Sequence, residues 1–360
     1  MKILIIQQKR IGDVLTSSIL CNILRESYPE AKIDFMCYQN CVAVLENNPN
    51  ISEIVVLHEE TRKSYFRLMK FIWKIRKRKY NVVIDVYSKL ETHLITKFSG
   101  AKSRISYKKK HSGLFYNITV ERFKNRSKPI IGLAIDNRLK LIESLVKKPI
   151  VNYKPKIFLT QKEHEKALSL LERFNIEKRK QPVLMINILG SQWYKHYPLD
   201  RMSKIIDFCV EKTQAKILFN YIPNQIEEAK TIYNQCFPET QKNIILDLYC
   251  ENLRDFLGLL SHCDALIGNE GGAVNMAKAI EIPTFSLFSP SVDKETWQLF
   301  EDDPKNISIH LKDLKPEIYE KYEEAYIKQH TYKYYDEYPF ELILKRLGEY
   351  LEYLNLQTKK

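Results

Sequence analysis

The sequence predicts an α/β protein made of two doubly wound domains, each a mostly parallel β-sheet with helices on both faces. Short apolar runs alternate with stretches of helical periodicity along the chain, which is the pattern of repeated strand and helix units. The alternation restarts after Pro149 and Pro155. The chain has 360 residues, about twice the ~150 residues of an ordinary domain. No apolar run approaches the ~18 residues of a membrane span.

The first domain opens with a strand, a turn and a helix. Residues 2–7 form a short β-rich run, and residues 12–27 carry apolar side chains at helical spacing. Further strands are predicted at residues 33–37, 54–57 and 82–86, and further helices at residues 65–75 and 90–98. This order predicts a parallel sheet.

The second domain repeats the pattern, with strands predicted at residues 183–187, 216–219, 244–246, 265–267 and 284–288. From about Asp302 the pattern dissolves into a tyrosine-rich, charged segment, and Pro339 precedes a last predicted helix at residues 340–354. We therefore divide the chain into a first domain at 1–152, a second at 153–338, and a C-terminal helix at 339–360. We expect that helix to pack back on the first domain.

Positive charge is concentrated in the first part of the chain. Residues 1–150 hold 29 Lys and Arg against 13 Asp and Glu, and the remaining residues hold 28 against 31. A half this basic could face nucleic acid, an anionic membrane or a phosphorylated substrate. Residues 62–79 combine such charge with Phe66, Phe71 and Trp73, either as a membrane-docking surface or as a solvated helix face with its aromatic side chains in the core.

Cysteine usage and the N-terminus indicate an intracellular setting. The seven cysteines include no CxxC pair, which argues against a disulfide framework and a structural zinc site. The first apolar run, of four residues, is shorter than the ~7 to 15 residues of a signal-peptide core. We expect a cytoplasmic protein, at most peripheral to the membrane.

Ligands of doubly wound sheets bind beyond the carboxyl ends of the strands, so three strand-to-helix loops are candidates. In the first loop, Gly12 leaves space beside Asp13. Asp13 could act as a general base, or it could simply complement the helix dipole.

The second loop contains Gly190, Ser191 and Lys195 before Pro198. Backbone amides, a hydroxyl and an ammonium at a helix start form a plausible phosphate cradle, although Lys195 could also be an ordinary surface lysine. The sequence is not a Walker A motif.

The third loop contains Gly268, Glu270, Gly271 and Gly272. Paired glycines at a helix start let amides reach a diphosphate, and a structural tight turn is the alternative. Glu270 would be electrostatically awkward there unless it contacts hydroxyls or a cation. A GxGxxG fingerprint is absent, which argues against a dinucleotide site.

Three segments together resemble glycosyltransferase family 9, the lipopolysaccharide heptosyltransferases: KRIGDVL from Lys9, KHYP from Lys195, and GNEGGAVNMA from Gly268. The resemblance implies the GT-B fold, two Rossmann-like domains facing across a cleft. It also implies an acceptor-binding first domain and a second domain that binds a nucleotide sugar.

The same resemblance implies roles for single residues. Asp13 matches the catalytic base, and Lys195 matches the lysine that meets the donor diphosphate. Glu270 stands where the family has Asp, and Asn275 stands where it has His. The family has a glutamate that contacts the ribose, and its nearest counterpart in this sequence is either Gln225 or Glu227. The expected catalytic residues are Asp13 and Lys195, and the expected ligand-binding residues are Gly12, Gly190, Ser191, Gln225, Glu227, Glu270, Gly271, Gly272 and Asn275.

The function predicted is inverting glycosyl transfer from a nucleotide-diphosphate sugar to a lipopolysaccharide-core-type glycolipid. The sugar would be heptose or a related one, ADP-linked, with no cofactor. No metal is expected, because Asp85-Val86-Tyr87 lacks a second carboxylate and Glu301-Asp302-Asp303 does not follow a predicted strand. The alternatives are a basic nucleic-acid-binding protein, which no recognisable binding motif supports, and a sugar-nucleotide epimerase of the same fold.

Overall fold

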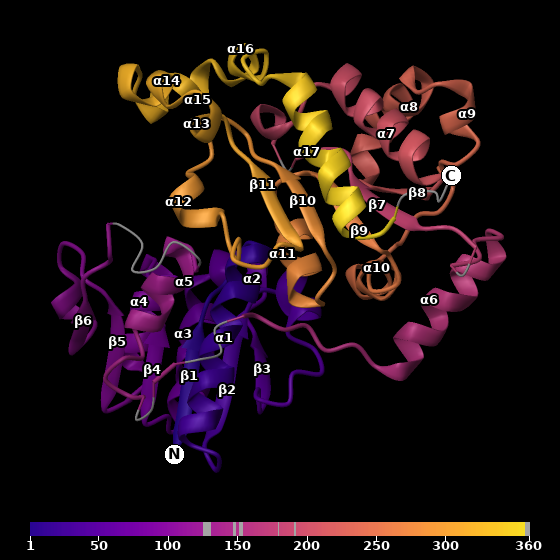
Figure 1. Cartoon of the computed structure of the whole chain (residues 1–360). Coiled ribbons are helices and arrows are strands. Elements are labelled where there is room, and N and C mark those ends of the chain that lie inside the picture. The colour runs from indigo at the N-terminus through magenta and orange to yellow at the C-terminus, as the bar shows by residue number, and fades with distance from the viewer. Residues whose placement is uncertain (125–130, 147–148, 151–153, 179, 191, 357–360) are drawn as a thin grey trace. The chain divides into compact units, whose positions relative to one another are not determined.

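The computed structural model describes residues 1–124, 131–146, 149–150, 154–178, 180–190 and 192–356. The chain divides into two compact units, Met1–Phe158 and Leu159–Lys360, a few residues beyond the predicted division at 152. Each unit is a parallel sheet with helices packed against it (Figure 1). Among the described helices, none combines the length and the apolar character needed to cross a bilayer.

The first unit is built on a six-stranded sheet in the order β3-β2-β1-β4-β5-β6. All its neighbouring strands are parallel, and the four apolar residues of the central strand are fully buried. The strands are β1 (Lys2–Ile6), β2 (Lys32–Cys37), β3 (Glu53–Val56), β4 (Val82–Asp85), β5 (Ser103–Tyr107) and β6 (Ile118–Val120). The predicted strands are confirmed, and β5 and β6 are additions to them.

Helices of the first unit cover the sheet through apolar faces. Leu68 and Ile72 of α3 pack with Ile95 of α4 against Leu4 and Val83 of the sheet. Side chains alternate between the two faces of a strand, so Ile3 and Ile5 are buried on the other face. The helices are α1 (Ile11–Ser27), α2 (Glu59–Lys63), α3 (Tyr65–Lys77), α4 (Leu90–Phe98) and α5 (Leu133–Lys140).

The second unit contains a five-stranded parallel sheet in the order β11-β10-β9-β7-β8. Its strands are β7 (Val183–Asn187), β8 (Lys216–Asn220), β9 (Ala265–Asn269), β10 (Thr284–Leu287) and β11 (Asn306–Ile309). The strand predicted at 244–246 is reduced to a single bridge between Ile244 and Ile217. Strand β11 lies where the sequence pattern dissolves.

The C-terminal helix belongs to the core of the second unit, which differs from the expected packing on the first domain. In α17, Ile343, Leu347 and Tyr350 are buried in the same apolar cluster as Phe285 of β10, and the helix packs on α7. The apolar stripe predicted at 340–354 is therefore used within this unit. The helices are α6 (Gln161–Arg173), α7 (Leu199–Thr213), α8 (Ile226–Gln235), α9 (Pro238–Gln241), α10 (Leu253–Leu260), α11 (Gly272–Ala279), α12 (Lys294–Trp297), α13 (Leu311–Leu314), α14 (Pro316–Lys321), α15 (Glu324–Gln329), α16 (Thr331–Tyr335) and α17 (Phe340–Tyr353).

Two expectations about side-chain burial have different outcomes. All seven cysteines are free and all but Cys250 are buried, as small apolar residues are. In α3, however, Phe66 and Trp73 are exposed, so the view that the aromatic side chains of this helix lie in the core is wrong for both.

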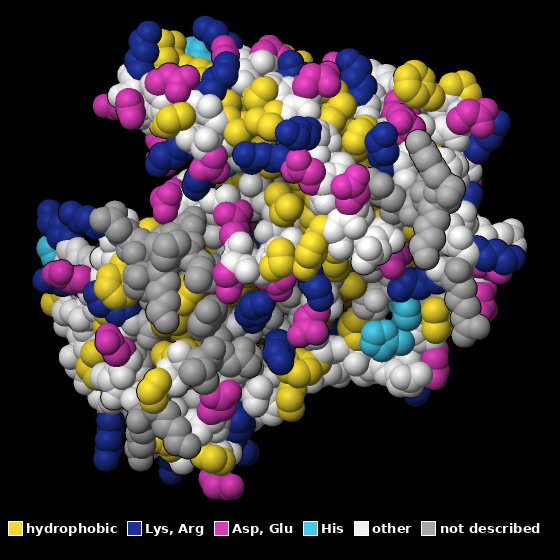
Figure 2. Space-filling model, in the orientation of Figure 1, with side chains coloured by type: hydrophobic (Ala, Val, Ile, Leu, Met, Phe, Trp, Pro, Cys, Tyr) yellow, Lys and Arg dark blue, Asp and Glu magenta, His cyan; other side chains and the backbone are white. Residues whose placement is uncertain are grey.

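On the face that Figure 2 shows, acidic and basic side chains are intermixed over the second unit, in agreement with its near-neutral balance of charge.

Candidate functional site

The turn between β9 and α11 depends on its glycines. Gly268 has φ +128°, and a Cβ there would lie 2.5 Å from the Asn187 carbonyl oxygen, so no other residue fits without displacing β7. Gly271 has φ +149°, and Gly272 begins α11. Among the described residues, no atom would lie within 4 Å of a Cβ on either residue. Space beside both glycines is what a ligand approaching the amides at the start of α11 would need.

Gly190 allows Lys195 to approach the end of β7. A Cβ at position 190 would lie 2.6 Å from both the Cβ and the carbonyl oxygen of Lys195, so a side chain there would push away the short 3-10 turn Trp193–Lys195 (η3). This packing role was not predicted. Ser191 lies outside the described residues.

The second and third loops meet in an ion pair. Lys195 Nζ donates to Glu270 Oε1 at 2.7 Å, with 21% of the lysine side chain and 8% of the glutamate side chain exposed. The Glu270 amide also donates to the Leu287 carbonyl at 2.9 Å, which fixes this residue beside β10. The glutamate beside the glycine turn thus contacts a cation, one of the two arrangements that the sequence allows.

Three asparagines, of which Asn187 and Asn269 are buried, connect the carboxyl ends of three strands, and sequence reasoning missed them. Tyr197 N donates to Asn269 Oδ1 at 2.7 Å, while Asn269 Nδ2 donates to the carbonyls of Asn187 and Ile188. Asn220 Nδ2 in turn donates to Asn187 Oδ1 at 2.7 Å. The signal was present, because all three asparagines end apolar strands, where a polar residue is unexpected.

The structure separates the two residues considered for the ribose. Gln225 Nε2 donates to the Gly190 carbonyl at 3.2 Å, which brings Gln225 to the second loop. Glu227 lies in the first turn of α8, 78% exposed and paired with Lys230 at 3.0 Å. Asn275 is half-buried on α11, where its backbone N–H donates to the Gly271 carbonyl.

Asp13 lies in the first turn of α1, directly after Gly12. Arg138 of α5, whose side chain is 7% exposed, donates from Nη2 to Asp13 Oδ1 at 2.7 Å. The same guanidinium donates to Ser17 Oγ at 2.8 Å and to the Ala134 carbonyl at 2.6 Å. Sequence reasoning missed Arg138, since nothing local links it to Asp13.

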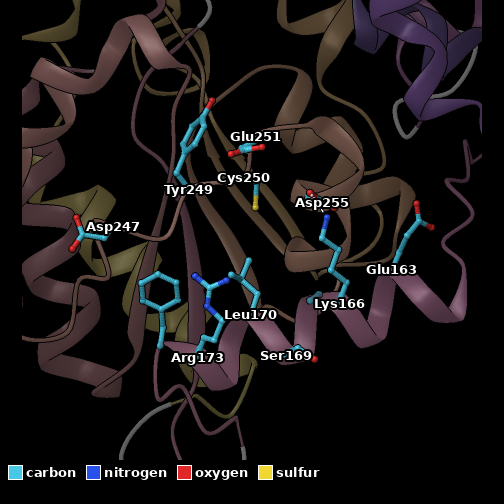
Figure 3. A pocket seen from close by; sticks show the side chains of 12 residues that line it. Glu163, Lys166, Ser169, Leu170, Arg173, Asp247, Tyr249, Cys250, Glu251 and Asp255 are labelled. Atoms are coloured by element: carbon cyan, nitrogen blue, oxygen red, sulfur yellow. Dashed lines mark hydrogen bonds and ion pairs between the residues drawn. The ribbon is translucent and has the colours of Figure 1, made fainter.

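A separate cavity of about 400 Å³ lies in the second unit between α6 and residues 247–255 (Figure 3). Both signs of charge line it, and Lys166 and Asp255 pair there at 2.7 Å. None of the predicted site residues is among its lining residues.

Over the described part of the chain, no three His, Cys, Asp or Glu side chains are grouped so that they could hold a metal ion.

Comparison with known proteins decides the family. Residues 68–327 match the sequence model of glycosyltransferase family 9 (heptosyltransferase). This chain belongs to glycosyltransferase family 9. The protein is therefore a glycosyltransferase, and its membership of family 9 favours this activity over nucleic-acid binding and over epimerisation. The matched range includes Lys195 and Glu270, whereas the Asp13 loop precedes it.

Relatives and solved structures agree with the family. Lipopolysaccharide heptosyltransferase 1 of Campylobacter coli is 20% identical over 80% of this chain and 84% of its own length. The family 9 glycosyl transferase from Veillonella parvula matches with a TM-score of 0.79 and 18% identity, over 98% of this chain and 97% of that one. The E. coli heptosyltransferase WaaC with ADP matches with a TM-score of 0.65 and 15% identity, over 86% and 93%. The two parallel-sheet units are thus those of the GT-B fold.

Proposed function

We propose that this glycosyltransferase moves a heptose or related sugar from an ADP-linked donor to a lipopolysaccharide-core-type glycolipid, with inversion and without a metal ion. The observation that carries the proposal is the meeting of Lys195, Glu270 and the glycine turn of α11 at the carboxyl edge of one sheet. ADP is proposed because WaaC was solved with it and because lipopolysaccharide heptosyltransferases are among the relatives.

The second unit supplies the donor side of the reaction. Charge grows on the diphosphate as it departs, and an ammonium with helix N-terminal amides stabilises such charge. Lys195 and the amides of Gly271 and Gly272 would take this role, which a metal ion fills in other transferases. Glu270 would accept from donor-sugar hydroxyls once the diphosphate shares Lys195, and Gln225 lies beside the same loop.

The first unit supplies the base. Asp13 would accept the proton of the acceptor hydroxyl while that oxygen bonds to the anomeric carbon and the bond from this carbon to the diphosphate oxygen breaks. Attack opposite the leaving group inverts the anomeric centre. Arg138 keeps the carboxylate in place for that step.

The acceptor side is proposed to be anionic and membrane-bound. The excess of 29 basic over 13 acidic residues within residues 1–150 suits a phosphorylated glycolipid on an anionic leaflet. We place the enzyme in the cytoplasm, peripheral to the inner surface of the membrane.

Thermal unfolding with ADP, UDP, GDP or CDP tests the donor site. A ligand at ~100 times its Kd stabilises by ~2.7 kcal/mol, and we expect ADP to raise Tm by several degrees. Lys195→Ala should reduce this shift, because its ammonium meets the ground-state diphosphate. Glu270→Gln should increase it, because Lys195 loses its carboxylate partner. Lys204→Ala, an exposed lysine of α7, is the matched control.

Turnover measurements test the chemistry. Asp13→Asn should lower kcat by ~10²- to 10⁴-fold with the ADP shift unchanged, and EDTA should leave activity unaltered. The proposal is wrong if no nucleoside diphosphate raises Tm while a short RNA does, or if EDTA abolishes transfer.

A further inference from the structure

The apolar surface of helix α3 is wider than the part of it that the first unit buries. Leu68, Ile72 and Ile75 pack on the sheet. The exposed apolar side chains are Tyr65 at 70%, Phe66 at 85%, Met69 at 37% and Trp73 at 56%. At roughly 100° per residue these four fall within one arc of about 100°. A short helix therefore presents a continuous aromatic face to its surroundings.

Positive charge borders this face. Residues 65–77 contain five Lys and Arg and no Asp or Glu. Lys70, Lys74 and Lys77 are exposed next to the apolar arc, and Lys77 Nζ lies 3.4 Å from the Trp73 ring centroid. Among the described residues, no carboxylate forms an ion pair with Lys70 or Lys74, whereas Arg67 pairs with Glu60 at 3.0 Å.

We propose that α3 docks the enzyme on an anionic lipid bilayer, with Phe66, Met69 and Trp73 in the interfacial layer and the lysines on lipid phosphates. This inference rests on the proposed function, whose acceptor is a glycolipid, and it names the element that reaches the membrane. A helix with one apolar stripe and a basic border lies in the plane of the interface, and each lysine near an anionic leaflet adds attraction. Trp and Tyr prefer that layer.

Charge favours an anionic bilayer over a second copy of the chain or a nucleic acid as the partner of this face. A second copy of α3 would bring two clusters of unpaired lysines together, which like-charge repulsion opposes. A bilayer rich in anionic lipid supplies apolar depth and negative charge at once, matching both features of the helix. A nucleic acid would match the charge and leave Met69 and the edge of Phe66 without an apolar partner.

Vesicle co-sedimentation tests the proposal, using phosphatidylglycerol with phosphatidylethanolamine and, separately, phosphatidylcholine alone. The full chain should bind the anionic vesicles and hardly bind the neutral ones. F66A/W73A and K70E/K74E should each weaken the partition by more than about tenfold. The matched controls are F237A/Y332A, exposed aromatic residues of the second unit, and K204E/K345E, exposed lysines of that unit. Both controls should bind like the unaltered protein.

Fluorescence gives a readout that needs no change in α3. The chain has three tryptophans, so W193F/W297F leaves Trp73 as the sole reporter. On anionic vesicles its emission should shift to shorter wavelength and be quenched by lipids brominated on the acyl chain.

Several results would overturn the inference: no binding of the unaltered chain to anionic vesicles, equal binding by the α3 variants, or Trp73 emission that lipid does not quench. RNA binding or dimerisation lost in F66A/W73A, without vesicle binding, would assign the face to that partner instead. The ADP-induced Tm shift should persist in every α3 variant. Loss of vesicle binding with the shift intact therefore bears on α3, and absence of the shift bears on the donor site.

Discussion

Arg138 is the residue on which the geometry of Asp13 depends. Its guanidinium is buried and divides its donors among the Asp13 carboxylate, Ser17 Oγ and the Ala134 carbonyl. A planar fork with several fixed donors orients a carboxylate in a way that a single ammonium does not. For the proposed base Asp13, Arg138 would therefore be a positioning residue.

Replacing Arg138 by Ala is expected to lower kcat by roughly 10- to 100-fold, because the Asp13 carboxylate loses its fixed orientation. KM for the donor should change little, since the proposed donor-binding residues lie in the second unit. Arg138→Lys should recover part of the lost kcat by restoring the charge. Arg104→Ala removes an arginine of the same unit that bonds backbone carbonyls and should leave kcat unaltered. Equal losses in both variants would assign Arg138 a purely structural role.

At the scale of elements, α13 begins at a histidine that must stay neutral. His310 Nε2 donates to the Val292 carbonyl at 2.9 Å, and its Nδ1 accepts from Lys312 N at 2.9 Å. Burial lowers the pKa of His310 from 6.5 to about 4. The imidazole of His310 binds a second ring proton more readily in the unfolded chain than in the folded protein. The contribution of His310 to stability is therefore complete above pH 6.5 and is lost as pH falls towards 4.

Between pH 7 and pH 5 the free energy of unfolding should therefore fall by about 2 kcal/mol through His310 alone. His310→Asn keeps a capping side chain at the start of α13 and should remove this slope, although it lowers stability at pH 7 by losing the bond to Val292. Urea denaturation at both pH values measures the difference. His111→Asn, at an exposed histidine, should keep the slope. An unchanged slope in His310→Asn would contradict the assignment.

The elements most visible in the sequence are those with a strong period. The amphipathic stripe of α1 and the apolar runs of β1, β7 and β9 predicted their position to within one or two residues. Strands β5 and β6 were not predicted, because β5 begins with Ser and Arg and β6 has only three residues. The apolar run at 244–246 looks like a strand and forms only one bridge.

At the scale of the whole molecule, the second unit has a hydrophobic core of its own. Residues 159–360 include a complete sheet and the helix α17 that covers it. The proposed diphosphate ligands Lys195, Gly271 and Gly272 also lie within this range. A unit with its own core is expected to fold alone.

We therefore expect a fragment of residues 159–360 to unfold cooperatively and to gain the same Tm shift with ADP as the whole chain. A fragment ending at residue 339 should aggregate or lose several degrees of Tm, because Phe285 and its neighbours lose the cover of Leu347 and Tyr350. Circular dichroism melts of both fragments measure this. Equal stability of the two would mean that α17 contributes little to the core.

The sequence by itself determined the two-sheet α/β architecture, the three loops and the glycines within them, because periodicity and glycine placement reflect local backbone needs. Only the tertiary structure decided which side chains meet. Lys195 finds Glu270 across 75 residues, and Arg138 finds Asp13 across 125. The tertiary structure also places α17 in the core of the second unit and leaves the aromatic face of α3 exposed. An amphipathic stripe specifies that one face of a helix will be buried, and the partner of that face follows from the packing of the whole unit.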